Sequence, residues 1–172
     1  MKHPLYRKIY EKQAGFYRRH AWAKKALWLL NHAFTLLIAA GYFSLLIVLA
    51  AVKAWRAVIF SCVLPLTAYI CVTVIRKLFR RSRPYEENGA GISPLFMKKD
   101  GAGKSFPSRH LTSAFVIATV VLPHAVWAAC VLYAFGLGLG YIRFAAGLHY
   151  PSDLVCGALL GAGVGALIFL VL

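Results

Sequence analysis

The chain has 172 residues, of which 60% are hydrophobic, and its 20 Lys and Arg against 5 Asp and Glu give a formal net charge of +15. A soluble domain is nearer to about 45–50% apolar, and the excess here lies in long runs, which excludes an ordinary soluble domain and indicates an all-α integral membrane bundle. The positive charge fits anionic lipid head groups or a phosphate-bearing substrate. No nucleic-acid-binding motif accompanies it, so a nucleic-acid partner is not expected.

The N-terminal segment, residues 1–25, carries eight basic residues interleaved with aromatic side chains at roughly helical spacing. This pattern predicts an amphipathic helix lying in the membrane interface. The alternative is a solvated basic tail that only sets the orientation of the protein in the bilayer.

Five apolar runs follow, and they predict membrane helices at about 32–52, 57–75, 108–122, 126–146 and 152–172. The third run is short for a full span, which needs about 20 residues. A glycine- and proline-containing segment at 76–107 separates the second and third runs, and a long loop of this kind is usually functional. We therefore expect a single domain over 1–172, with 76–107 as the active-site loop.

Three chargeable side chains interrupt the last two runs: Arg143, His149 and Asp153. Charged residues near the hydrocarbon cost roughly 2.5–3.5 kcal/mol each on insertion scales, so they are functional candidates by default. Counting the predicted spans places these residues on the same membrane face as the other polar segments, which begin at Arg76 and at Pro107. This coincidence predicts one composite site.

Each piece of this site has a structural alternative. The basic cluster after the second run is most often a membrane-flanking charge run, and Ser108 alone is most often a helix N-cap. A histidine and a carboxylate four residues apart, His149 and Asp153, form a structural hydrogen bond about as often as a catalytic pair.

Together, the pieces suit phosphoryl transfer. Guanidinium groups and a helix N-terminus bind phosphate oxygens. One histidine can attack phosphorus to give a phosphohistidine, and a second can protonate the leaving oxygen. The sequence offers no carboxylate cluster for Mg²⁺ or Zn²⁺, so we expect a metal-independent mechanism with no metal ion and no cofactor.

Three motifs in this order resemble those of the type 2 phosphatidic acid phosphatase superfamily of membrane lipid phosphatases. The first is Arg76-x6-Arg83-Pro84, the second is Pro107-Ser108-Arg109-His110, and the third is Arg143-x5-His149-x3-Asp153. The resemblance covers roughly Pro65 to the C-terminus and implies a multi-pass protein of a bacterial plasma membrane.

The resemblance also implies roles for the matching residues. His149 would attack phosphorus, Asp153 would orient it, and His110 would be the general acid and then the base. Substrate oxygens would be bound by Arg83, Arg143 and Ser108.

The sequence departs from the family motifs at three positions. Arg76 takes the place of the first motif's lysine, and Lys77 follows it, so either side chain can fill that role, with spacing favouring Arg76. Arg109 replaces the glycine of the second motif and adds a cation beside the phosphate. Ile142 replaces the serine before Arg143.

The predicted function is hydrolysis of a membrane lipid phosphate or diphosphate, with undecaprenyl diphosphate, phosphatidylglycerophosphate and phosphatidic acid as candidates. Lys98, Lys99 and Lys104 would suit a diphosphate or neighbouring lipids. A lipid phosphotransferase and a non-catalytic lipid-binding protein remain as alternatives, and the oligomeric state is open. The membrane face of the site is open too. Of the 20 lysines and arginines only Lys53 and Arg56 fall on the opposite face, so the positive-inside rule favours the cytoplasm, whereas the resemblance favours the outside.

Overall fold

The structure is a computed structural model that describes residues 4–87, 92–95 and 103–172, and within these residues all regular structure is helical. Lys98 and Lys99 lie outside the described residues. The helices are α1 (Pro4–Arg19), α2 (Ala21–Ala51), α3 (Trp55–Leu78), α4 (Arg109–Val121), α5 (Val126–Ala145) and α6 (Pro151–Ala166), with a 3₁₀ turn at Leu167–Leu170.

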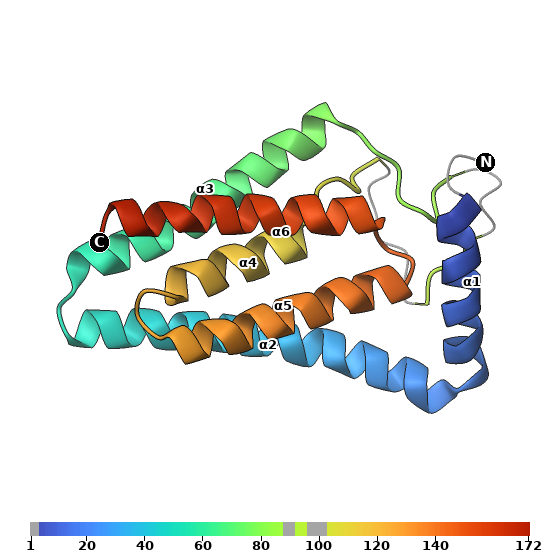
Figure 1. Ribbon diagram of the computed structural model, residues 1–172, viewed down its shortest axis with the longest axis horizontal. Coiled ribbons are helices and arrows are strands. Elements are labelled where there is room, and N and C mark those ends of the chain that lie inside the picture. Colours follow the sequence, from blue (N-terminus) through green and yellow to red (C-terminus); the bar gives the residue numbers. More distant parts are fainter. Residues whose placement is uncertain (1–3, 88–91, 96–102) are drawn as a thin grey trace.

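The centre of the bundle is α4, which lies between α6 and α3 on one side and α5 and α2 on the other (Figure 1). A larger share of its residues is buried than in the longer helices around it, and Val116, Ala118 and Val120 are almost inaccessible. The surrounding helices expose large apolar side chains instead, such as Leu36, Ile47 and Trp127. A bundle that is apolar on its outer surface is expected of a membrane protein, because lipid replaces water there.

Four helical segments are long and apolar enough to cross a membrane: Ala21–Ala51, Trp55–Leu78, Val126–Ala145 and Pro151–Leu170. The predicted third span is the shorter α4, with 13 residues. The predicted all-α membrane bundle is therefore confirmed, as four spanning helices around a shorter apolar one.

Two predicted boundaries are wrong. The first membrane helix begins at Ala21 rather than near residue 32, because helical backbone continues through Lys24 and Lys25 before the apolar run starts. Hydropathy marks the part of a helix that lies in hydrocarbon and not where the helix begins. Similarly, α3 runs to Leu78, so Arg76 and Lys77 belong to its last turn and not to the loop predicted at 76–107.

The predicted N-terminal helix exists but is shorter than 1–25, because the chain breaks at His20 before α2 starts. It lies across the end of the bundle and runs crosswise to the other helices (Figure 1). One face of α1 is buried, with Tyr10 and Ala14 almost inaccessible. A helix packed in this way is not a solvated tail. Because α1 runs crosswise to the helices that are long enough to span a membrane, it has the orientation expected of a helix that lies in the membrane interface.

The glycines of α6 allow it to approach α4 at backbone contact distance. A Cβ added to Gly157 would lie 2.7 Å from the carbonyl oxygen of Ser108, and one added to Gly161 would collide with the carbonyl oxygen of Thr112. Glycines four residues apart in α6 thus permit close packing of the two helices. This packing brings the start of α6, with Asp153, against the start of α4, with Ser108.

Candidate active site

The candidate site lies at the end of the bundle beside α1, where α3 and α5 end and α4 and α6 begin (Figure 1). All three motifs therefore contribute side chains at this end, as the count of spans predicts. Buried charged or polar side chains gather here: Arg76, Arg83, Ser105, Ser108, Arg143, His149 and Asp153.

A tight turn after α5 places His149. Gly147 adopts a left-handed conformation with φ 72°. Its N–H donates to the carbonyl of Phe144 at 3.0 Å, and the Leu148 N–H donates to that of Arg143 at 3.1 Å. This pair of bonds is a Schellman motif, in which glycine ends a helix and reverses the chain. A Cβ at Gly147 would also lie 2.8 Å from the Tyr10 ring of α1. Both the left-handed backbone conformation and the close approach of Tyr10 therefore require glycine at this position.

Asp153 is fixed by the start of α6, where Pro151 occupies the first turn, in which the missing N–H of a proline costs nothing. Its Oδ2 accepts the N–H of Tyr150 at 3.0 Å. Its backbone carbonyl accepts the N–H of Ser108 at 2.9 Å, which ties the second motif to the third. The Asp153 side chain is completely buried.

His149 and Asp153 are adjacent, as predicted, with 3.7 Å between Nδ1 and Oδ2. His149 is 3% exposed. Burial lowers the pKa of His149 below its usual value, and the positive charges of Arg83 and Arg143 lower it further, while the carboxylate of Asp153 acts in the opposite direction. The imidazole is therefore neutral at pH 7, which is the form that a nucleophile needs.

Two contacts to Asp153 involve residues that sequence reasoning did not select. The Arg81 Nη1 donates to Asp153 Oδ1 at 2.8 Å. The Ser105 hydroxyl donates to Oδ2 at 2.5 Å and lies 3.5 Å from His149 Nδ1. Arg81 was one of several cations in the basic cluster, and no spacing rule distinguished it. Ser105 stands in a loop segment whose sequence carries no positional signal.

Four arginines and one serine present buried polar atoms that have no hydrogen-bond partner within the described part of the chain. These atoms are Arg76 Nε, Arg83 Nε and Nη1, Arg109 Nε, Arg143 Nε and Ser108 Oγ. Ser108 holds the N-cap position of α4, but its side chain makes no capping bond. Buried donors are normally satisfied, so this set is suited to an anion with several oxygens.

The adjacent residues Arg76 and Lys77 differ in direction. Arg76 is buried and its Nη1 donates to the carbonyl of Pro107 at 3.2 Å, at the start of the second motif. Lys77 is exposed. On geometry, Arg76 points into the site and Lys77 points away from it.

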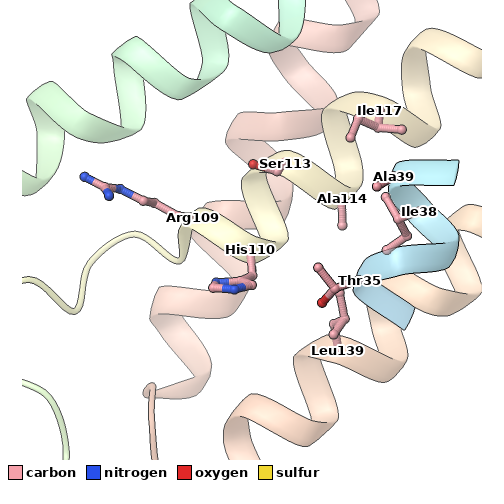
Figure 2. Close-up of a pocket in the computed structure, with 9 residues that line it drawn as sticks. All are labelled: Thr35, Ile38, Ala39, Arg109, His110, Ser113, Ala114, Ile117 and Leu139. Carbon is pink, nitrogen blue, oxygen red and sulfur yellow. The ribbon is translucent and has the colours of Figure 1, made fainter. Parts of the chain in front are cut away.

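Arg109 and His110 begin α4 and diverge from each other (Figure 2). The Arg109 guanidinium lies over the Tyr69 ring of α3, 5.4 Å from its centroid. His110 points to a different side of α4 (Figure 2). A cavity of about 270 Å³ lies between α2, α4 and α5, and Arg109 and His110 are both among the residues that line it. The remaining lining is mostly apolar: Thr35, Ile38, Ala39, Ser113, Ala114, Ile117 and Leu139.

The sequence model of the PAP2 superfamily matches residues 57–172, more than half of the chain. The chain belongs to the PAP2 superfamily. The resemblance of the three motifs to this superfamily is therefore confirmed, and the matched region contains α4, α5, α6, all but the first two residues of α3, and every motif residue.

Two curated bacterial relatives of this PAP2 chain are phosphatases by name. The lipid A 4′-phosphatase of Bacteroides thetaiotaomicron is 32% identical over 104 residues, which cover 58% of this chain and 46% of the relative. The putative undecaprenyl-diphosphatase YbjG of Escherichia coli is 34% identical over 85 residues, which cover 49% and 41%. The matched region thus spans less than half of each relative.

Two crystal structures share the PAP2 fold over almost the whole chain. LpxE of Aquifex aeolicus is 27% identical with a TM-score of 0.60, and the match covers 94% of this chain and 93% of that one. A transmembrane PAP2-type phosphatidylglycerolphosphate phosphatase of Bacillus subtilis is 20% identical with a TM-score of 0.59, covering 94% and 90%. With its apolar helices, this PAP2 chain is a multi-pass protein of the cell membrane.

Proposed function

We propose that this protein hydrolyses a membrane lipid phosphate or diphosphate through a phosphohistidine intermediate, without a metal ion. The observation that carries the proposal is a set of buried guanidinium N–H groups without a hydrogen-bond partner at the same end of the bundle as a buried neutral histidine, where the charges of Arg83 and Arg143 act on that histidine. Positive donors bind the equatorial oxygens of a transferring phosphoryl group, and they must be in place before the charge develops.

In the proposed site, Arg76, Arg83 and Arg143 hold the phosphate oxygens together with the hydroxyl of Ser108. The first N–H groups of α4 add donors, since the start of a helix has no internal acceptors for them. Arg76 fills the role of the first motif's lysine because it is buried and Lys77 is exposed. Arg109 adds positive charge at the side of α3.

The proposed reaction has two steps. The Nε2 lone pair of His149 forms a bond to phosphorus while the bond from phosphorus to the leaving oxygen breaks, and His110 gives that oxygen its proton. In the second step His110 takes a proton from water, whose oxygen attacks the phosphohistidine, releases phosphate and restores neutral His149. Asp153 stays ionised and stabilises the charge that His149 gains.

The cavity beside His110 supports a lipid as the leaving group. An acid that protonates the leaving oxygen must lie next to the group attached to it. On one side of His110 lies the mostly apolar cavity of about 270 Å³, lined from helices α2, α4 and α5. A hydrocarbon chain of a lipid fits such a lining, whereas a water-soluble sugar phosphate without a hydrocarbon chain does not.

The test is phosphate release from purified protein in detergent with EDTA. The substrate panel is undecaprenyl diphosphate, lipid A, phosphatidylglycerophosphate and phosphatidic acid, and His149→Ala and Lys77→Ala variants run alongside. We expect release that survives EDTA, disappears in His149→Ala and persists in Lys77→Ala. Any steady release is enzymatic, because uncatalysed phosphate ester hydrolysis is extremely slow. Loss of release with EDTA, or full release from His149→Ala, would contradict the mechanism. Phosphate transfer that depends on an added acceptor would identify a phosphotransferase instead.

A further inference from the structure

The Ser105 hydroxyl contacts both His149 and Asp153, the two residues of the third motif that act together in the proposed mechanism. The side chain of Ser105 is completely buried. Its backbone N–H donates to the carbonyl of Arg81 at 2.9 Å, which holds this segment against the chain that follows α3. The hydroxyl lies 2.5 Å from Asp153 Oδ2 and 3.5 Å from His149 Nδ1.

The direct path from His149 to Asp153 is longer than a hydrogen bond. Nδ1 and Oδ2 are 3.7 Å apart, and polar contacts beyond about 3.5 Å are not hydrogen bonds. The hydrogen-bonded path from the imidazole to the carboxylate therefore passes through the Ser105 hydroxyl. This path is a property of the serine and would not exist if an alanine stood there.

The chemistry of a hydroxyl sets the direction of this path. A serine hydroxyl has one proton to donate and lone pairs to accept with. Its proton goes to Asp153, because an ionised carboxylate can only accept. Towards His149 the hydroxyl can therefore act only as an acceptor, so Nδ1 must carry a hydrogen. A neutral imidazole with hydrogen on Nδ1 has its lone pair on Nε2.

We propose that Ser105 is a positioning residue that fixes the Nδ1–H tautomer of His149 and leaves Nε2 free to attack phosphorus. The catalytic consequence rests on the proposed function, whereas the tautomer is a property of the protein without substrate. Each part can therefore be tested without the other.

Asp153 does not depend on Ser105 for its own position. Arg81 binds Oδ1 at 2.8 Å, and the Tyr150 N–H binds Oδ2 at 3.0 Å. The carboxylate keeps both partners when the hydroxyl is removed. A Ser105→Ala variant thus interrupts the path to the imidazole and leaves the acid anchored.

The kinetic test compares Ser105→Ala and Ser105→Thr with Ser61→Ala as the matched control. Ser61 is equally buried, but it lies on α3 outside the site, and its hydroxyl has no partner within the described residues. We expect Ser105→Ala to lower kcat by about 10- to 100-fold with KM changed by less than about 2-fold, as for other groups that orient a catalytic histidine. Ser105→Thr, which keeps a hydroxyl, should recover most of kcat, and Ser61→Ala should match the parent. An unchanged kcat in Ser105→Ala would overturn the proposal.

The spectroscopic test needs no substrate. The ¹⁵N chemical shifts of the His149 ring, assigned by difference from His149→Gln in histidine-labelled protein, report which nitrogen carries the hydrogen. We expect Nδ1–H in the parent and in Ser61→Ala, and a loss of that preference in Ser105→Ala. Nε2–H in the parent, or an unchanged tautomer in Ser105→Ala, would overturn the proposal even if the variant proved unstable. A parent that shows Nδ1–H but releases no phosphate from any lipid would instead contradict the proposed function alone.

Discussion

Arg81 and Asp153 form an ion pair at the site, with 2.8 Å between Nη1 and Oδ1. The Asp153 side chain is completely buried, and the Arg81 side chain is 31% exposed. The same guanidinium lies 4.5 Å from the centroid of the Tyr150 ring and donates to the hydroxyl of Ser152. A cation of the loop after α3 thus holds the acid at the start of α6 and connects two distant parts of the chain.

Removal of this cation should destabilise the protein. In Arg81→Gln, a buried carboxylate loses its only ion-pair partner among lysines and arginines of the described residues. We expect a loss of about 1–3 kcal/mol in unfolding free energy, since hydrogen bonds to charged groups contribute about 1.5–3 kcal/mol. Arg80→Gln is the control, because Arg80 is exposed and adjacent. Thermal unfolding in detergent measures the difference, and equal stability of the two variants would contradict the role of Arg81.

Arg76 and Lys77 allow a direct test of which cation serves the substrate. Arg76 is buried, contacts the carbonyl of Pro107 and retains an unpartnered Nε, whereas Lys77 is exposed. We expect Arg76→Ala to lower kcat/KM by about 10²- to 10³-fold, the usual effect of losing one donor to a developing oxyanion. Lys77→Ala should stay within a few-fold of the parent. Phosphate release at several substrate concentrations gives both values, and the reverse order would assign the role to Lys77.

Much of this arrangement was predictable from the sequence. Each apolar run predicted a helix, and the alternation of helix directions placed the polar ends of four helices together. Glycines four residues apart, such as Gly157 and Gly161, are a sequence pattern typical of close helix packing, and here they bring α6 onto α4. The spacing of His149 and Asp153 around Pro151 predicted their proximity, and the structure places them 3.7 Å apart.

Other features were not predictable because they depend on tertiary contacts. Ser105 meets Asp153 only because its loop segment is tied to Arg81 by a backbone hydrogen bond. The difference between Arg76 and Lys77 is a matter of helix phase at the end of α3, and the motif spacing could only favour one of them. The burial of Tyr10 against Gly147 required knowledge of where α1 packs, which an amphipathic pattern does not give.

The pH dependence of the activity should reflect the lowered pKa of His149. Burial, Arg83 and Arg143 disfavour the protonated imidazole, so the acid limb of kcat/KM should have its midpoint below the usual histidine value of about 6.5. The same shift affects stability. At a pH between the pKa of His149 in the folded protein and its value of about 6.5 in the unfolded chain, the unfolded chain binds more protons than the folded protein. The contribution of neutral His149 to the free energy of unfolding is therefore complete above pH 6.5 and is lost as the pH falls through the folded pKa. Initial rates at low substrate concentration measure the limb, and a midpoint above 6.5 would contradict the assignment of the neutral imidazole as nucleophile.

The contact between α6 and α4 can be tested with two glycines of the same helix. A Cβ at Gly161 would collide with the backbone of α4 at Thr112 and Val116, which cannot rotate away. A Cβ at Gly163 meets no atom within 4 Å. We expect Gly161→Ala to destabilise the protein by about 1–3 kcal/mol or more. We also expect it to reduce kcat, because separation of the two helices would move the backbone carbonyl of Asp153 away from the Ser108 N–H, which it accepts at 2.9 Å. Gly163→Ala should be neutral or stabilising by up to about 1 kcal/mol, since alanine favours a helix more than glycine does. Thermal unfolding and phosphate release, measured on both variants in the same detergent, decide the matter: equal behaviour of the two would mean that α6 and α4 do not approach at backbone distance.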